Sequence, residues 1–292
     1  MSAFPDFESH LRDGELSEAK GPIAVILVED GAAVGATPTH HLRGGFKTLL
    51  VLSAQPIPDG AVPPESAERV VNLRYNARQA GAHVAVVNAL IETVPEDTWL
   101  YHCYNAEFLF FPFSETRTIS EMLAFHAEER RRALLTYVID LYAPDLQRFS
   151  DAVSLSEAMF DRNGYYALGR KDRQGGFLDR QLDFFGGLRW RFEEHLPEDR
   201  RRIDRIAIFR TRPGLKLLPD HRFNIEEYNT YSCPRHNNLT AAITSFRVAK
   251  ALASNPGSRQ VIRDMTWRNS HPFRWNSQQL MDLGLMEPGQ WF

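Results

Sequence analysis

The sequence predicts an α/β protein in which a mainly parallel central sheet is flanked by helices. Two continuous apolar runs, residues 23–28 (IAVILV) and 99–104 (WLYHCY), are typical of strands that are buried on both faces. Between them, strand-like and helix-like segments alternate, which is the pattern of a doubly wound sheet. Because edge strands avoid continuous apolar runs, we expect residues 23–29 and 99–104 to be neighbouring interior strands.

The N-terminal half supplies the elements of this sheet in order. Residues 37–43 predict a short helix that ends at Gly44-Gly45. Residues 46–53 (FKTLLVLS) and 69–74 are the next expected strands. Residues 76–94 carry apolar side chains at helical spacing before Pro95, so a helix leads into the strand at 99–104.

The C-terminal half is less regular. Residues 118–129 predict a helix that is capped by Thr118 or Ser120. The polar, glycine-containing residues 171–180 predict a mobile loop. Further strands are expected at residues 134–140, 164–169, 205–210 and 239–247, and further helices at 248–253 and 277–285.

Composition limits the class of protein. The 292 residues fit one large domain or one domain with an appendage, and a net charge of −3 argues against nucleic acid as a partner. No apolar run is long enough for a transmembrane segment, and residues 1–20 lack the apolar core of a signal peptide. We therefore expect a cytoplasmic protein whose thiols are reduced. A disulfide between Cys103 and Cys233, its two cysteines, has no support from their spacing.

A polar step at residues 105–107 separates two apolar runs and is the first candidate site. Ligands of α/β proteins bind at the carboxyl ends of strands, and Glu107 follows the end of an expected core strand. Glu107 is therefore a candidate catalytic carboxylate. A salt-bridged or capping glutamate in a turn is an equally good interpretation.

The stretch 98–113 (TWLYHCYNAEFLFFPF) resembles a segment of the family 2 glycosyltransferases, in which an apolar run led by tryptophan precedes Asp-x-Asp-Glu-Phe-Leu. Glu107-Phe108-Leu109 match the end of that motif. The resemblance implies a GT-A fold, which is Rossmann-like, and a nucleotide-sugar substrate. In that family the two aspartates hold a divalent metal on the diphosphate. Here their positions are occupied by Tyr104 and Ala106, so the motif is degenerate.

The resemblance extends over most of residues 23–247 and implies further site residues. After the first strand, Glu29 and Asp30 would lie near the nucleotide, and His41 would follow on the next helix. A glycine-rich turn with arginine corresponds to residues 183–192 (DFFGGLRWRF), and a histidine turn corresponds to Asp220-His221. The implied nucleotide-sugar-binding residues are Glu29, Asp30, His41, Asn105, Gly186, Gly187, Arg189 and His221.

The residues themselves give this second segment two interpretations. Paired glycines let the backbone approach a ligand closely, and Arg189 and Arg191 would share one face of a strand, where guanidinium groups suit phosphate. The alternative is a surface strand with two solvated arginines. For the two histidines of the resemblance, structural hydrogen bonding is the commoner role.

The expected function is transfer of a sugar from a nucleotide-sugar donor to a hydroxyl acceptor, with Glu107 and Asp183 as the candidate catalytic carboxylates. Without the aspartates, Asn105 and Glu107 would hold Mn²⁺ or Mg²⁺ weakly, if any metal binds, or Arg189, Arg191 or Arg205 would replace the metal. The alternative is a catalytically inactive GT-A-like binding or assembly module. Whether the product is a polysaccharide, a lipid or a protein stays open.

The expected organisation has three parts. An N-terminal segment (1–20) precedes the glycosyltransferase-like domain (21–253), and an aromatic-rich extension (254–292) packs on that domain or on a partner subunit. Large apolar side chains in this extension make a homo-oligomer possible.

Overall fold

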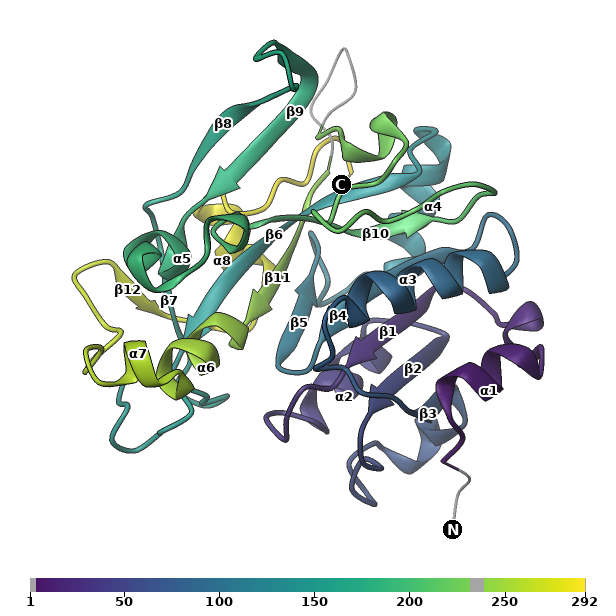
Figure 1. Cartoon of the computed structure of the whole chain (residues 1–292), viewed down its shortest axis with the longest axis horizontal. Coiled ribbons are helices and arrows are strands. Elements are labelled where there is room, and N and C mark those ends of the chain that lie inside the picture. The colour runs from purple at the N-terminus through teal and green to yellow at the C-terminus, as the bar shows by residue number, and fades with distance from the viewer. Residues whose placement is uncertain (1–3, 232–238, 292) are drawn as a thin grey trace. The chain divides into compact units, whose positions relative to one another are not determined.

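The computed structural model describes residues 4–231 and 239–291 (Figure 1). The protein belongs to the α/β class, with a mixed, mostly parallel sheet and a small two-stranded sheet. The chain divides into two compact units. Unit 1 comprises the described residues up to Phe108 together with Thr116–Leu134 and Ile206–Asn229. Unit 2 comprises Leu109–Glu115, Leu135–Arg205 and the described residues from Thr230 onward.

Unit 1 contains the elements predicted for the N-terminal half, the helix predicted at 118–129, and a helix within residues 1–20 that was not predicted. In chain order these are α1 (Phe7–Arg12), β1 (Ile23–Leu27), α2 (Ala36–Arg43), β2 (Thr48–Ser53), β3 (Val70–Arg74), α3 (Ala82–Thr93), β4 (Trp99–Tyr104) and α4 (Ile119–Glu128). Three further strands have residues in both units: β5 (Glu107–Phe110), β6 (Ala133–Tyr142) and β10 (Asp204–Arg210).

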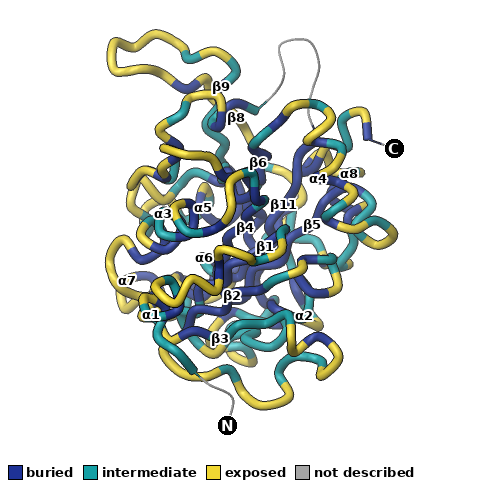
Figure 2. Tube along the Cα trace, turned by 90° about the vertical axis from the view of Figure 1, so that its right-hand side faces the viewer, coloured by how far each residue is buried: buried dark blue, intermediate teal, exposed yellow. Residues whose placement is uncertain are grey.

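The strands of unit 1 lie in the order β3-β2-β1-β4-β10. β1 pairs in parallel with β2 on one side and with β4 on the other, and β10 runs antiparallel to β4. The prediction that residues 23–29 and 99–104 are neighbouring interior strands is therefore confirmed. Every residue of β1 is buried, which explains why its sequence is apolar throughout instead of alternating. Figure 2 shows β1, β2 and β4 in the colour of buried residues.

The helices of unit 1 connect these parallel strands. Because the crossover from β1 to β2 and the crossover from β3 to β4 run in opposite directions, right-handed connections put α2 and α3 on opposite faces of the sheet. Figure 1 shows α3 passing across β4. α3 begins later than predicted because Gly81, with φ of 73°, ends the preceding turn. α4 begins at the predicted cap, where Thr118 and Glu121 form a capping box.

Unit 2 contains shorter elements. They are β7 (Met159–Asp161), β8 (Tyr166–Lys171), β9 (Phe177–Phe185), α5 (Gly187–Arg191), β11 (Ala241–Ser245), α6 (Arg247–Ser254), α7 (Pro256–Arg259), β12 (Ser270–Pro272) and α8 (Ser277–Asp282). In its sheet, β6 pairs in parallel with β11 and antiparallel with β7, which pairs with β12. β8 and β9 form an antiparallel hairpin whose tip is exposed (Figure 2). The predicted loop at 171–180 is mostly this hairpin, and its turn is closed by Asp172.

The C-terminal extension lies in unit 2. α8 begins where the helix at 277–285 was predicted, is capped by Asn276, and ends at Asp282. Phe273 and Trp291 are buried, and their rings pack against Phe110 and Phe111. Among the helices of residues 4–231 and 239–291, none has the length and apolar character that a membrane crossing requires. Cys103 is buried in β4, and Cys233 lies outside the described residues.

Candidate functional site

The carboxyl ends of β1 and β4 form the topological switch point of the sheet in unit 1. The chain leaves β1 toward β2 and β3, and then returns to place β4 on the other side of β1. In open α/β sheets, ligands bind where the strand order reverses in this way. Glu29 and Asp30 follow β1 at this point, half-buried, and Asn105 follows β4. We refer to residues 28–35 and 105–107 as the switch-point loops.

Asn105 joins the two switch-point loops. Its side-chain oxygen accepts a hydrogen bond from the Glu29 backbone N–H at 2.8 Å. Its side-chain nitrogen donates to the Asp30 carboxylate at 2.7 Å, to the Asp30 carbonyl at 3.2 Å and to the Ala32 carbonyl at 2.9 Å. Asn105 itself is fully buried. An amide fits this position because it donates and accepts at once, whereas a carboxylate could only accept.

The turn after β4 is held in a costly backbone conformation. Ala106 has φ of 60°, in the left-handed region that residues with a Cβ seldom adopt. Its backbone N–H donates to the Thr37 hydroxyl at 2.9 Å, and the Glu107 carboxylate accepts from the Tyr104 N–H at 2.9 Å. Backbone strain of this kind is concentrated at functional sites, so it marks the turn as a candidate. Glu107 is buried, which shields its carboxylate from solvent.

His41 lies inside unit 1, on α2. Its Nδ1 is 2.8 Å from the Thr37 carbonyl oxygen, and its ring packs on Tyr101 and Phe46. Burial, followed by the neighbouring His40, lowers the pKa of His41 to about 3. The imidazole is therefore neutral at physiological pH and contributes no positive charge toward a phosphate.

Arg78 extends the switch-point loops toward the end of β3. Its Nε donates to the backbone carbonyl of Glu29, and its side chain is otherwise exposed. A cavity of about 480 Å³ lies on the same edge of the sheet, at the ends of β2 and β3. It is lined by Asp6, Glu8, Ala54, Arg74, Tyr75, Asn76 and Gln79. This volume is within the range of small-molecule sites in proteins.

A chain of three histidines adjoins the switch point and was not predicted from the sequence. The Nε2 of His83, on α3, is 2.7 Å from the Nδ1 of His102, on β4. The Nδ1 of His83 is 3.0 Å from the Nδ1 of His221, and these two rings stack at 4.8 Å. His83 also packs against Tyr104, the last residue of β4. The available signal was a histidine in an otherwise apolar strand, which needs a polar partner when buried.

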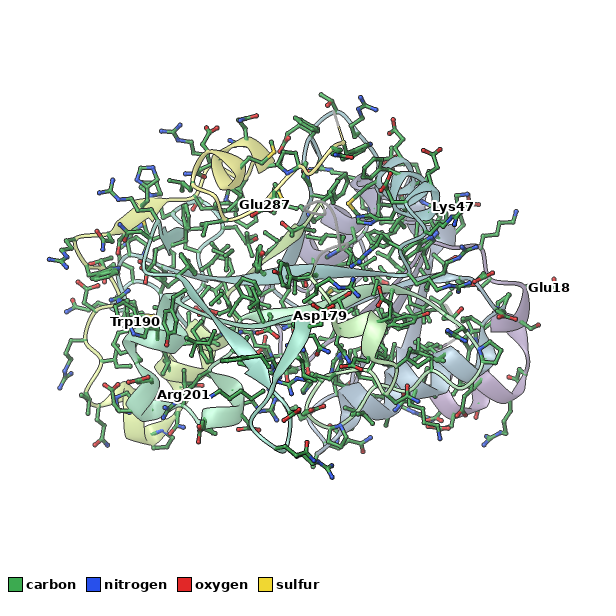
Figure 3. The ribbon with its side chains drawn as sticks, turned by 90° about the horizontal axis from the view of Figure 1, so that it is seen from above. Glu18, Lys47, Asp179, Trp190, Arg201 and Glu287 are labelled. Atoms are coloured by element: carbon green, nitrogen blue, oxygen red, sulfur yellow. The ribbon has the colours of Figure 1, made fainter. Side chains whose placement is uncertain are left out.

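The predicted residues of unit 2 have a different environment. The segment 187–191 is helix α5, so the prediction of a strand with Arg189 and Arg191 on one face is wrong. Arg189 is buried, and its Nε lies 3.3 Å from the Asp140 carboxylate. Arg191 pairs with Asp161 at 3.1 Å. We refer to these two ion pairs as the arginine–aspartate cluster. Trp190, between the two arginines, is labelled in Figure 3.

Asp183 and the paired glycines also have partners within unit 2. The Asp183 carboxylate lies 2.9 Å from Arg170 and 3.1 Å from Arg202. A Cβ at Gly186, whose φ is 155°, would lie 2.2 Å from the Tyr165 ring, and a Cβ at Gly187 would lie 3.1 Å from the Asp140 carboxylate. Close packing against protein groups therefore explains both glycines without a ligand.

The predicted site residues are thus divided between the two units. Unit 1 holds Glu29, Asp30, His41, Asn105, Glu107 and His221, and unit 2 holds Asp183, Gly186, Gly187 and Arg189. Asn105, Glu29 and Asp30 are brought together directly. The resemblance implies that Glu107 and Arg189 serve one nucleotide-sugar site. This stays a prediction, since these two residues belong to different units.

The residues after β4 do not fit a divalent metal. Asn105 uses both atoms of its amide within the switch-point loops, and the side chain of Ala106 has no ligand atom. Throughout residues 4–231 and 239–291, no group of three or more His, Cys, Asp or Glu side chains could hold a metal ion.

In comparisons with known proteins, no family model and no curated protein matches the chain.

Proposed function

We propose that this protein binds a nucleotide sugar at the switch point of a GT-A-like sheet and transfers the sugar to a hydroxyl acceptor. The observation that carries the proposal is the Asn105 side chain, which joins the loops after β1 and β4. The strand order β3-β2-β1-β4, with an antiparallel strand beside β4, puts these loops where such sheets bind nucleotides. The resemblance of residues 98–113 to the glycosyltransferase motif adds independent support.

The carboxylates of the first switch-point loop suit the nucleoside part of the donor. Ribose hydroxyls donate hydrogen bonds to carboxylates, and Asp30 is oriented by Asn105 at 2.7 Å. Binding there would place the diphosphate toward Arg78, the exposed arginine that reaches the Glu29 carbonyl. Arginine supplies fixed charge and several donors, so it can stabilise the departing diphosphate without a metal. Arg189 and Arg191 are less suited, because each is already paired with an aspartate.

The transfer needs a carboxylate that accepts the proton of the acceptor hydroxyl. The hydroxyl oxygen then bonds to the anomeric carbon while the bond from that carbon to the diphosphate breaks. Glu107 and Asp183 are the proposed candidates. Glu107 would have to become accessible when the donor binds, and Asp183 would have to leave Arg170 or Arg202.

The second candidate function is a GT-A-like module that binds without catalysis. It is favoured by the engagement of Asp183, Arg189 and Arg191 in internal ion pairs. Both functions predict that a nucleotide binds at the switch-point loops. Only the first function predicts that the protein releases a nucleoside diphosphate from a nucleotide sugar.

The test begins with calorimetric titration of the protein with UDP, GDP, CDP, ADP and dTDP, with and without Mn²⁺. We expect one of them to bind, and Arg78→Met to weaken it by about tenfold, the effect of one lost charge-assisted contact. Arg43→Met, which removes another exposed arginine of unit 1, is the matched control. No binding by any diphosphate, or equal losses in both variants, would remove the switch point as a donor site.

Turnover separates the two functions. Glu107→Gln keeps the size of the side chain and removes the base, so it should abolish release of the diphosphate while affinity is retained. Asp183→Asn provides the same comparison for the second candidate. Nucleotide binding without release in the unmodified protein, across a panel of donors and hydroxyl acceptors, would support the non-catalytic module.

A further inference from the structure

Unit 2 contains a cavity of about 260 Å³ whose lining includes four aromatic residues. The lining residues belong to β6, β8 and β9, to the residues next to the strands, and to the C-terminal segment. They are Tyr137, Ile139, Tyr165, Tyr166, Ala167, Phe184, Ile203, Gly284, Leu285 and Glu287. The volume is slightly below the range of sites that take drug-sized ligands, so any ligand is small.

Two of the aromatic walls form a corner. The ring centroids of Tyr137 and Phe184 are 4.9 Å apart, and the ring planes meet at 60°. A corner of this kind contacts a rounded group on two sides, whereas a sugar ring stacks one C–H face on a single aromatic plane. Tyr165 adds a third aromatic ring to the wall, whereas Tyr166, which also lines the cavity, stacks its ring on Phe185 at 5.2 Å on the other face of the hairpin. We refer to Tyr137, Phe184 and Tyr165 as the aromatic corner.

Strand pairing and hydrogen bonds fix the aromatic corner in place. The carbonyl of Phe184 accepts from the Ile203 N–H at 2.8 Å, and the Phe184 N–H donates to the Asp204 carboxylate at 2.8 Å. The Tyr165 hydroxyl donates to the Asp161 carbonyl at 2.8 Å. These rings are therefore positioned before a ligand arrives, which reduces the entropy lost on binding.

The charge of the cavity is negative. Glu287, labelled in Figure 3, is the one ionisable acid or base among the described lining residues apart from the tyrosines. Two backbone hydrogen bonds hold it to Thr240: the Glu287 N–H donates to the Thr240 hydroxyl, and the Thr240 N–H donates to the Glu287 carbonyl, both at 2.9 Å. Burial, followed by the charges of Glu287 and Asp204, raises the pKa of Tyr137. The tyrosine therefore stays neutral.

We propose that this cavity binds a small quaternary or methylated ammonium group, held by the aromatic corner and by Glu287. The negative faces of aromatic rings attract a cation, and several rings around one ammonium form the cages that recognise choline or methylated amines. The Glu287 carboxylate adds a charge of the required sign. A phosphate or carboxylate ligand is disfavoured because no lysine or arginine is among the described lining residues.

The test compares ligands of one shape and different charge. The unmodified protein is titrated calorimetrically with choline, with tetramethylammonium, with 3,3-dimethyl-1-butanol, which is the neutral isostere of choline, and with methyl glucoside. Choline and tetramethylammonium should bind at least about tenfold more tightly than the neutral isostere, since cation–π attraction is absent from it. Equal affinity for choline and the isostere, preference for methyl glucoside, or no binding of either cation would overturn the proposal.

Variants then locate the binding. Tyr137→Leu and Glu287→Gln should each weaken choline by about tenfold, whereas Tyr137→Phe, which keeps the ring, should retain it. Unchanged melting temperatures in Glu287→Gln and in Tyr166→Leu, an exposed position, guard against loss of the fold. Tyr166→Leu, which removes a ring on the other face of the hairpin, should retain choline binding. Choline affinity that is unaffected by Tyr137→Leu and by Glu287→Gln would place binding elsewhere and overturn the assignment.

The source of the ammonium group is separated in a last step. Sedimentation of the protein with phosphatidylcholine vesicles, but not with phosphatidylglycerol vesicles, would assign the group to a lipid headgroup. Choline binding without sedimentation would assign it to a free small molecule. The outcome does not depend on the proposed sugar transfer, because no nucleotide or donor sugar is present in these titrations.

Discussion

The switch-point loops of unit 1 and the arginine–aspartate cluster of unit 2 both hold charged residues that the sequence marks as functional, but they hold them differently. Around Asn105, acidic residues follow strand ends and are held by an amide and by backbone groups. In the cluster, Asp140 and Asp161 are buried and are neutralised by Arg189 and Arg191. Removing one partner of a buried ion pair destabilises the fold, whereas the end of a sheet at which the strand order reverses is where α/β proteins bind ligands.

The largest expected effect is on the cluster. Arg189→Met should lower the free energy of unfolding by about 3–5 kcal/mol, because it leaves the Asp140 carboxylate buried and unpaired. Urea denaturation measures the loss, and Arg200→Met, at an exposed arginine nearby in the sequence, should change stability by less than about 0.5 kcal/mol. A stable Arg189→Met variant that loses nucleotide binding would break the comparison and move Arg189 into the donor site.

The next effect belongs to the switch point. Asn105→Ala removes every hydrogen bond that its side chain makes to residues 29–32, and should cost about 3 kcal/mol of stability together with nucleotide binding. Stability is followed by urea denaturation and binding by calorimetry. The exposed Asn163→Ala variant is the control for both. If Asn105→Ala is as destabilised as expected but binds nucleotide normally, Asn105 has only a structural role.

The two units should respond to pH in opposite directions. Burial lowers the pKa of His41 and of His126, both in unit 1, from 6.5 to about 3. In the unfolded chain these two histidines bind protons at a higher pH than they do in the folded protein. The stability that they contribute is therefore complete above pH 6.5 and is lost as the pH falls toward 3. Between pH 7 and pH 5 the loss is about 2 kcal/mol for each histidine.

Asp140 in unit 2 behaves conversely. Burial raises the pKa of this carboxyl, so its contribution to stability is present at low pH and is lost as the pH rises through the raised pKa.

The histidine effect can be tested by removing both imidazoles. The double variant His41→Leu/His126→Leu should show a smaller difference in stability between pH 7 and pH 5 than the unmodified protein, as measured by urea denaturation. An unchanged difference would mean that neither histidine is kept neutral by the fold.

The smallest expected effect is with metal ions. Calorimetry with Mn²⁺ and no nucleotide should show no binding tighter than about 1 mM, because the Asn105 amide is engaged and the Ala106 side chain has no oxygen. Replacing both positions of the motif, Tyr104→Asp with Ala106→Asp, should increase the affinity. Tight binding by the unmodified protein would show that the switch point is a metal site after all.

The fold was predictable where burial alone decides the sequence pattern. Residues 23–27 are apolar throughout, and residues 99–104 are apolar or aromatic apart from His102, because both faces of the sheet are covered. This property also made them neighbours in the prediction. The carboxyl ends of these strands could then be located, and with them Asn105, Glu29 and Asp30. What the sequence does not carry is the hydrogen-bond role of Asn105, which depends on the register of β1 against β4.

Short segments held by tertiary contacts were harder to predict. Arg189, Trp190 and Arg191 alternate as a strand would, yet α5 is a helix, in which buried Leu188 and Arg189 face the interior and Asp140 accepts from the Arg189 N–H. A helix of five residues has no periodicity of its own, so its partners determine its conformation. The contact between His83 and His102 was likewise hidden, because it requires α3 to be placed on β4 before the two residues meet.

The chain formed by His221, His83 and His102 has a consequence for how protons are arranged beside the switch point. A neutral imidazole has one N–H, so His83 can donate to only one neighbour and must accept from the other. When all three rings are neutral, they have two self-consistent tautomeric patterns, which are of opposite polarity. A change from one pattern to the other moves the proton on His221 and on His102 together. The partly exposed ring of His221 is therefore linked to the buried ring of His102 inside β4, and His102 lies three residues before Asn105.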